Sequence, residues 1–178
     1  MPVLDDLRTV SRAEVRPVLR PVQPSDATFL RDLFESSRSD DFAFLPVGAR
    51  TALIDLQFGA QAAQYRASHP QAEQALITVG GASVGQVFLA RLPRAIMLVD
   101  ITVLDSHRKR GIGTAVIGAL IEQADAARLP VHLSVWAQNT AARRLYARLG
   151  FAEIATQAGS LRMQRPSQPA APTPTVER

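Results

Sequence analysis

Basic residues and glycines that suit an anion lie together near the middle of the chain, in the segment Arg108-Lys109-Arg110-Gly111-Ile112-Gly113. Alternating apolar residues before this segment predict a strand, and an apolar stripe of helical spacing after it predicts a helix. The Gly-x-Gly pair would therefore stand at a helix N-terminus, where unpaired N–H groups and the helix dipole favour negative charge. Glycine also permits positive φ and close approach of a ligand. The segment predicts a site for a phosphate-bearing ligand.

Two common nucleotide-binding motifs do not fit this segment. The P-loop pattern G-x-x-x-x-G-K-[ST] is absent. A dinucleotide fingerprint requires a third glycine, but Val116 occupies that position. It also requires an acid at the end of the following strand, and Trp136–Gln138 contains none. Both nucleotide-binding motifs are therefore excluded.

A second segment contains side chains that could take part in binding or catalysis. It runs from Asn139 to Phe151 and reads Asn-Thr-Ala-Ala-Arg-Arg-Leu-Tyr-Ala-Arg-Leu-Gly-Phe. Asn139 or Thr140 suits the N-cap of a helix, and Gly150 suits its C-terminal stop. Tyr146 lies four residues before that glycine, so it could simply pack beneath the helix.

The two segments together resemble the GCN5-related N-acetyltransferase (GNAT) family. Arg108-x-x-Gly111-x-Gly113 is similar to the family's acetyl-CoA motif, [RQ]-x-x-G-x-[GA]. The segment from Asn139 to Phe151 is similar to its N-x-x-A…Y-x-x-x-G-F signature, at the expected spacing of about 25 residues. The resemblance covers roughly residues 97–153. It implies a mixed α/β acyl-CoA N-acyltransferase fold, with a central, mostly antiparallel sheet flanked by helices.

The resemblance also implies a cofactor, a reaction and roles for individual residues. Acetyl-CoA would be the cosubstrate, and an amine would attack its thioester directly in a ternary complex. Tyr146 would protonate the departing thiolate, and Asn139 would hydrogen-bond the cofactor, although Asn139 also suits a purely structural N-cap. The residues implied to hold the cofactor are Ile101, Thr102, Val103, Arg108, Lys109, Arg110, Gly111, Ile112, Gly113, Thr114, Asn139 and Tyr146.

The general base is where this sequence departs from the family pattern. Some branches of the family carry a Glu on the strand before Asn139, but here that strand, 131–136, has no acid. Asp100 lies on the strand before the glycine loop, on the same face as Thr102 by alternation, and is the candidate for base or amine contact. The alternatives are that Asp100 is structural, and that ordered water relays the proton without a dedicated base.

The acceptor would be a small-molecule amine or an amine of a peptide or protein. In this fold the first two helices wall the acceptor pocket, so residues of about 35–66 would select the acceptor. The polar side chains there that suit a cationic amine are Glu35, Asp40, Asp41, Gln57 and Tyr65.

The elements that must position these residues follow from periodicity and turn signals. We expect an edge strand at 18–22, because Pro21 is excluded from a central strand. A helix capped by Ser25 or Asp26 and a second helix over 49–67 should follow. Leu53, Leu56, Ala60, Ala63 and Ala67 recur near helical spacing in the second helix. The remaining expected elements are strands at 75–79, 84–92, 95–104, 131–136, 151–155 and 161–164, a turn at Gly80-Gly81, and helices at 114–128 and 141–149.

Composition narrows the class of protein. The 178 residues include no cysteine and three separated histidines, so we expect no disulfide, no cysteine-based acyl-enzyme and no metal site. The sequence has no run of apolar residues long enough to cross a membrane and no secretory signal, so we expect a cytoplasmic protein. We expect one domain over 16–165, a loosely ordered segment at 1–15 and a disordered proline-rich tail at 166–178.

The basic balance, +4 with a pI near 10.6, comes from arginines spread along the chain, with Lys109 the sole lysine. Nucleic-acid binding is therefore a minor alternative. The main rival to an active enzyme is a non-catalytic acyl-CoA-binding module that senses the cofactor or regulates a partner. A homodimer is left open as the assembly state.

Overall fold

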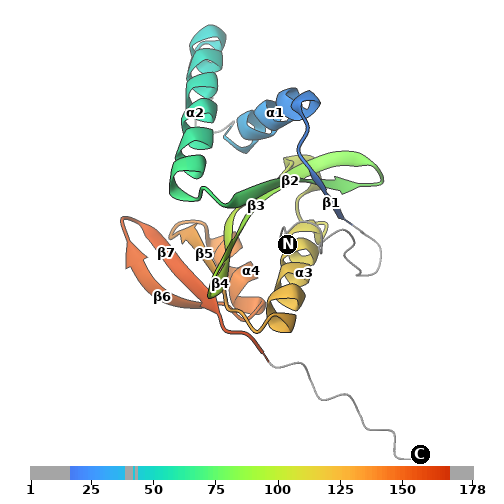
Figure 1. Cartoon of the computed structure of the whole chain (residues 1–178). Coiled ribbons are helices and arrows are strands. Elements are labelled where there is room, and N and C mark those ends of the chain that lie inside the picture. The colour runs from blue at the N-terminus through green and yellow to red at the C-terminus, as the bar shows by residue number, and fades with distance from the viewer. Residues whose placement is uncertain (1–16, 39–41, 43, 169–178) are drawn as a thin grey trace, which may run out of the picture.

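The described residues, 17–38, 42 and 44–168, form one seven-stranded sheet in a computed structural model of the chain (Figure 1). The strand order is β1-β2-β3-β4-β5-β7-β6, and every neighbouring pair is antiparallel except the parallel pair β4–β5. This is the mixed, mostly antiparallel sheet that the sequence predicts. The strands are β1 (Val18–Pro21), β2 (Ala72–Val79), β3 (Ala82–Leu92), β4 (Ala95–Val103), β5 (Val131–Trp136), β6 (Ala152–Gln157) and β7 (Ser160–Arg165).

Helices cover both faces of this sheet, with α1 and α2 on one side of β1–β4 and α3 on the other (Figure 1). The expected segment 1–15 and most of the expected tail lie outside the described residues. The helices are α1 (Ala27–Ser37), α2 (Val47–Ser68), α3 (Ile112–Ala126) and α4 (Thr140–Arg148), with 3-10 turns η2 (Pro24–Asp26) and η4 (Asp105–His107).

Local turn chemistry places the strands as expected. Gly80 and Gly81 both take positive φ, 57° and 82°, and join β2 to β3 as a tight hairpin. Pro21 ends β1, which is one of the two edge strands of the sheet. The cap of α1 differs from the expectation. Asp26 occupies the N-cap without capping through its side chain, because its carboxylate instead accepts two hydrogen bonds from Arg20 and one from Gln23 N.

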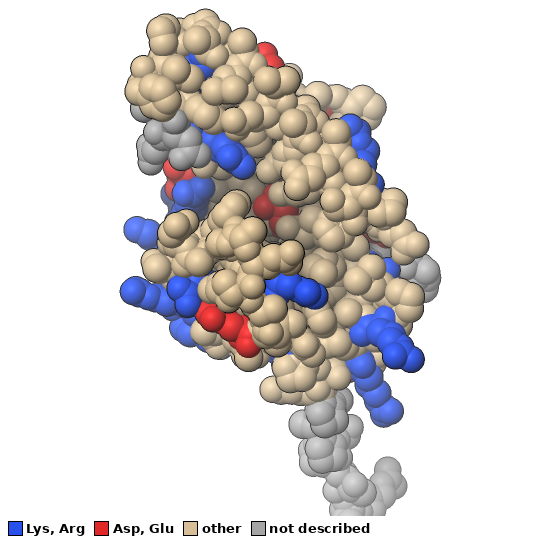
Figure 2. All heavy atoms as spheres, turned by 90° about the vertical axis from the view of Figure 1, so that its left-hand side faces the viewer, with Lys and Arg blue, Asp and Glu red and all other residues tan. Residues whose placement is uncertain are grey.

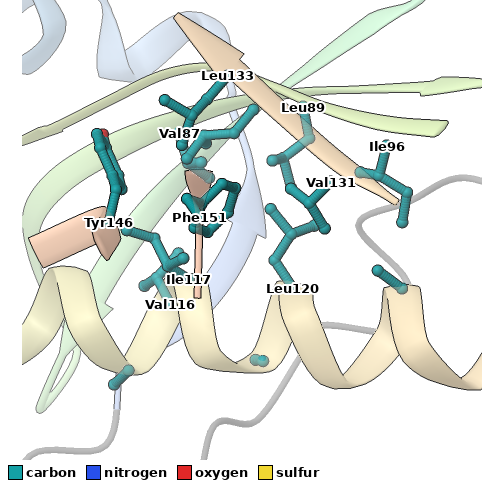
Figure 3. Packing of buried hydrophobic residues seen from close by; sticks show 14 of the residues in the cluster. Val87, Leu89, Ile96, Val116, Ile117, Leu120, Val131, Leu133, Tyr146 and Phe151 are labelled. Carbon is teal, nitrogen blue, oxygen red and sulfur yellow. The ribbon is translucent and has the colours of Figure 1, made fainter. Parts of the chain in front are cut away.

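The main core lies between the sheet and helix α3. Figure 3 shows Val87, Leu89 and Val131 projecting from the strands toward Ile117 and Leu120 of the helix. All five side chains are buried. This contact fixes the face of α3, and therefore the direction in which its N-terminus points.

Helix α2 is confirmed as an element, but its buried row differs from the sequence expectation. Ile54 is its one buried residue, and it packs with Phe34 and Phe42 in a smaller cluster. Leu56 is 69% exposed, and the expected alanine row is exposed as well. The reason is that alanines favour a helix through their propensity alone, whether or not they are buried.

A β-bulge in β4 decides where Asp100 points. Leu89 pairs with Leu98 and Phe88 pairs with Asp100, so Val99 has no partner on β3. Leu98 therefore faces the α3 core, whereas Asp100 faces the side covered by α1 and α2. Without the extra residue, strict alternation would bury the carboxylate in the apolar core.

Gly85 on β3 lets β4 lie close at the same level. A Cβ at this position would collide with the carbonyl oxygen of Thr102 and lie 3.1 Å from the Cα of Val103. The glycine is therefore required for close approach of the strand end that precedes the basic loop.

Candidate active site

A cavity of about 1140 Å³ opens where β4 and β5 separate. The two strands pair only from Ile96–Leu98 with Val131–Leu133. Both continue beyond this point, β4 to Val103 and β5 to Trp136, and residues from both line the cavity. Loop 107–114 and α4 line it on one side, and the ends of α1 and α2 line it on the other.

The basic loop presents unpaired backbone donors to this cavity. Arg108 N donates to Asp105 O at 3.2 Å, and the next backbone N–H along the chain with a backbone acceptor is that of Ala115, which donates to Gly111 O at 2.9 Å. Within the described chain, the amides of 109–114 between them have no backbone acceptor. Positive φ at Lys109 (61°) and Gly111 (81°) bends the loop, and Gly111 is the N-cap of α3. These are the features of an anion-binding helix N-terminus.

Arg108 has a structural role that its sequence position does not reveal. Its guanidinium pairs with Asp105 at 2.9 Å and donates to the carbonyl of Val103 at 3.3 Å. The side chain therefore ties the loop to the end of β4. The backbone N–H of Arg108 also donates within the loop, to Asp105 O. The backbone donors of the loop that remain available to a ligand are therefore the amides of 109–114.

Helix α4 brings Asn139 and Tyr146 to the cavity wall. Asn139 Oδ1 accepts from Ala142 N at 3.0 Å, so the expected N-cap is present. The ring of Tyr146 is buried edge-on against Phe151, with centroids 5.7 Å apart. In Figure 3 its hydroxyl points away from α3. No group of the described chain hydrogen-bonds that hydroxyl. Burial, with a contribution from the negative charge of Asp100, raises the pKa of Tyr146 to about 12.

A chain of polar side chains across three strands holds Asp100. Its carboxylate accepts from Thr102 Oγ1 at 3.1 Å and from Gln86 Nε2 at 3.5 Å. Gln86 is 5% exposed, and its Oε1 accepts from Gln74 Nε2 at 2.9 Å. Burial raises the pKa of Asp100, while these hydrogen bonds and the charge of Arg38 partly offset that effect. The carboxyl is therefore oriented, and its pKa lies closer to neutrality than that of a solvated aspartate.

The cavity is lined by more basic than acidic side chains. Asp100 is the sole carboxylate among the described lining residues. Figure 2 shows acidic atoms recessed in the hollow of this face and basic side chains around it. The lining cations beside the loop and α4 are Arg108, Lys109, Arg144 and Arg148, while Arg38 lies at the opposite end, on α1.

The structure brings together nearly all of the residues expected at the site. Asp100, Ile101–Val103, Asn139, Tyr146 and the loop residues line one cavity, with the exception of Arg110 among those predicted. Of the expected acceptor residues, Tyr65 lines the cavity, whereas Glu35 pairs with Arg31. Gln57 is not among the lining residues, and Asp40 and Asp41 lie outside the described residues.

Sequence reasoning missed Arg38, Gln61, Gln64 and Gln86 as lining residues. Gln86 could have been identified from the sequence, because a glutamine in the interior of an apolar strand needs a polar partner. Arg38 carries none, since it looks like any other surface arginine at the end of a helix.

The described residues offer neither a metal site nor a membrane span. They contain no group of three or more His, Cys, Asp or Glu side chains placed to hold a metal ion. None of the helices described is long and apolar enough to cross a membrane.

Solved structures with the same fold include acetyltransferases. The PaiA N-acetyltransferase of Thermoplasma acidophilum, in complex with coenzyme A, is 14% identical, with a TM-score of 0.63 over 84% of this chain and 98% of that chain. The ribosomal-protein-S18-alanine N-acetyltransferase of Escherichia coli is 18% identical, with a TM-score of 0.58 over 88% and 97%. A histone acetyltransferase HPA2-related protein of Corynebacterium glutamicum is 22% identical, with a TM-score of 0.61 over 87% and 99%.

The sequence comparison identifies the family. No curated protein matches the chain significantly. Residues 31–151 match the profile of the acetyltransferase (GNAT) family, and this range contains the basic loop, Asp100 and Tyr146. The match spans more than half of the chain and the structural neighbours share its fold, so this protein belongs to the acetyltransferase (GNAT) family.

Proposed function

We propose that this protein is an N-acetyltransferase that moves the acetyl group of acetyl-CoA to a primary amine within a ternary complex. The observation that carries the proposal is the arrangement of one cavity. Unpaired amides at a helix N-terminus lie on one wall, and Tyr146 and Asp100 line the same space. Such a cavity suits a ligand with phosphates at one end and a reactive group at the other.

The cofactor residues divide by the part of the ligand they suit. The amides of 109–114 suit the pyrophosphate, because they point from a helix N-terminus and lack backbone acceptors. The main chain of Ile101–Val103 lies where β4 has left β5, so it suits strand-like pairing with the pantetheine arm. Asn139 keeps its amide nitrogen for the cofactor while its Oδ1 caps α4.

An acceptor that binds as an ammonium must lose two protons in the reaction. After the first is removed, the amine nitrogen bonds to the acyl carbon, the carbon–sulfur bond breaks and the nitrogen loses its second proton, so that one proton ends on the CoA sulfur and the other in solvent. We assign two roles to Asp100: its carboxylate binds the amine, and it accepts a proton from the nitrogen. Its raised pKa makes it a stronger base than an ordinary carboxylate.

Tyr146 suits the leaving-group side. Its phenol stays protonated through neutral pH, because its pKa is about 12. An ordinary thiol has a pKa of about 8.5, so the departing thiolate accepts a hydrogen bond from the phenol more readily than it takes the proton outright. The role of Tyr146 is therefore to stabilise the developing negative charge on sulfur as the bond breaks.

The rival function, a non-catalytic acyl-CoA-binding module, rests on the absence of an acid on β5. A thiol-release assay with acetyl-CoA over a panel of amines and peptides separates the two, with mass spectrometry to locate the acetyl group. We expect amine-dependent release of CoA and an N-acetylated product. Tight binding of acetyl-CoA with no turnover on any acceptor would support the rival.

A further inference from the structure

The far end of the cavity, beneath α1 and α2, contains two opposite charges. The residues of this acceptor end are Phe34, Arg38, Gln61, Tyr65, Gln86 and Asp100. The other four are neutral: Phe34 is apolar, whereas the amides of the two glutamines and the phenol of Tyr65 can donate or accept hydrogen bonds. Tyr65 packs edge-on against Phe88, with centroids 5.0 Å apart, so the aromatic wall is held in place.

The side chain of Arg38 is held by an aromatic ring and has no ion-pair partner among the described residues. Its guanidinium carbon lies 5.2 Å from the centroid of Phe34, in cation–π contact, and the side chain is half-buried. No carboxylate of the described chain forms an ion pair with it. By contrast, Arg31 on the same helix is bound to both Asp55 and Glu35. Arg38 lines the cavity, and its guanidinium, which can donate two parallel hydrogen bonds, has no acceptor among the residues that the structure describes.

Arg38 lies within electrostatic reach of Asp100 and Tyr65 without contacting either. Its charge works against the effect of burial on the pKa of Asp100. Burial and the negative charge of Asp100 raise the pKa of Tyr65 to about 12, and Arg38 opposes this rise. The acceptor end therefore contains one anion and one cation that are separated by more than an ion-pair distance, with neutral groups beside them.

We propose that the acceptor is a zwitterion, a small amino acid whose amine lies at Asp100 and whose carboxylate is bound by Arg38. This inference rests on the proposed function for the amine and goes beyond it in naming the second group. A carboxylate matches the planar fork of a guanidinium, which can donate to both of its oxygens. A polyamine would place a second cation near Arg38, and a simple alkylamine would leave Arg38 without a partner.

The proposal also accounts for release of the product. Acetylation forms the N–C bond and breaks the C–S bond, and the ammonium nitrogen loses two protons, one to the CoA sulfur and one to solvent, so the zwitterion becomes a monoanion. The amide no longer bears the positive charge that Asp100 attracts, and only the contact with Arg38 remains. Product affinity should therefore be lower than substrate affinity.

Matched triads of compounds test this inference by binding, independently of turnover. Calorimetry on the CoA-saturated protein would compare leucine, leucinamide and 3-methylbutylamine. Glycine, β-alanine and 4-aminobutyrate would vary the spacing of the charges. We expect at least one amino acid to bind about tenfold or more tightly than its amide or amine, from the charge-assisted hydrogen bonds to Arg38.

Variants of Arg38 test whether this residue is the cause of the preference for an amino acid over its amide. Arg38→Gln should remove the preference by weakening the amino acid about tenfold to a hundredfold while leaving the amide unchanged. Arg38→Lys should retain part of it, because the charge remains without the fork. Arg66→Gln is the matched control, since Arg66 is exposed on α2 outside the cavity lining and its loss changes the net charge equally.

Each other outcome is decisive. Amides or amines that bind as well as every amino acid would overturn the zwitterion, as would equal losses for acid and amide in Arg38→Gln. Preferential binding of an alanine-starting peptide amide would instead assign a protein N-terminus. Thiol release is measured separately: selective binding of amino acids with no turnover refutes the proposed function alone, and turnover of amines without a carboxylate preference refutes this inference alone.

Discussion

At the scale of single residues, the proposed reaction uses a buried phenol, Tyr146, and a half-buried carboxyl, Asp100. Tyr146 and Asp100 come from α4 and β4, and the negative charge of Asp100 contributes to the raised pKa of Tyr146. The two groups therefore share one electrostatic environment, although 45 positions of the sequence separate them. Their roles can be separated by variants that alter one group at a time.

Tyr146→Phe removes the hydroxyl and keeps the ring packed on Phe151. We expect kcat to fall about tenfold to a hundredfold, because the hydrogen bond from the phenol to the departing thiolate is lost. Affinity for acetyl-CoA, measured by calorimetry, should change little. Turnover at the wild-type rate would make Tyr146 a packing residue only.

Asp100→Asn tests the base through the pH profile. Because burial raises the pKa of Asp100, its ionised form appears only above the usual carboxyl range, and kcat/KM should rise with pH through that raised pKa. The variant should lower kcat/KM about a hundredfold and lose this limb of the profile. An unchanged profile with lower activity would instead support proton transfer through water.

At the scale of elements, the sequence was sufficient for those defined by short-range chemistry. Gly80-Gly81, the basic loop and the Asn139 cap predict a hairpin, a helix start and α4, and all three are present. The bulge at Val99 was not predictable, because it depends on how β3 and β4 pair. The side chain of Asp26 is likewise drawn away from its cap position by Arg20, a tertiary contact.

Variants of Asn139 can distinguish its role as the N-cap of α4 from its proposed contact with the cofactor. Asn139→Ser retains an oxygen that can cap α4, whereas Asn139→Ala removes it and should cost about 1 kcal/mol of unfolding free energy. If the amide also contacts the cofactor, both variants should weaken acetyl-CoA binding to a similar degree. The measurements are urea unfolding and calorimetry. Wild-type affinity in Asn139→Ser would show that the residue is a cap alone.

At the scale of the whole molecule, an ion pair joins the C-terminal end of the sheet to helix α3. Arg165 at the end of β7 is bound to Asp125 of α3 through two hydrogen bonds of 2.8 and 3.0 Å. Gln168 N donates to the same carboxylate, so the chain is attached up to that point. The acceptor end is assembled from α1, α2, β3 and β4, which explains why local sequence patterns did not identify Arg38.

Acid stability should report the pair of Arg20 and Asp26. The guanidinium of Arg20 and the backbone N–H of Gln23 lower the pKa of Asp26 from 3.8 to about 2. A lowered carboxyl pKa means that this contribution to stability is present above 3.8 and is lost as the pH falls toward about 2.

Urea midpoints recorded across that range for wild type and Asp26→Asn measure the effect. The variant should be less stable at neutral pH and should show a flatter decline in acid. Asp32→Asn, an exposed substitution on the same helix, serves as the control. Parallel declines in wild type and Asp26→Asn would refute the assignment.

The central claim is that the loop before α3 holds the pyrophosphate of acetyl-CoA, and two glycines of one helix test it most directly. A Cβ at either Gly113 or Gly118 would meet no protein atom within 4 Å, but only Gly113 lines the cavity. Valine at either position should therefore preserve the fold, with a small gain in helix propensity.

Calorimetric titration of acetyl-CoA into Gly113→Val and Gly118→Val is the decisive measurement. We expect Gly113→Val to lose binding, because the valine side chain would occupy the space of the phosphates, and we expect Gly118→Val to bind as wild type does. Wild-type affinity in a folded Gly113→Val protein would contradict it.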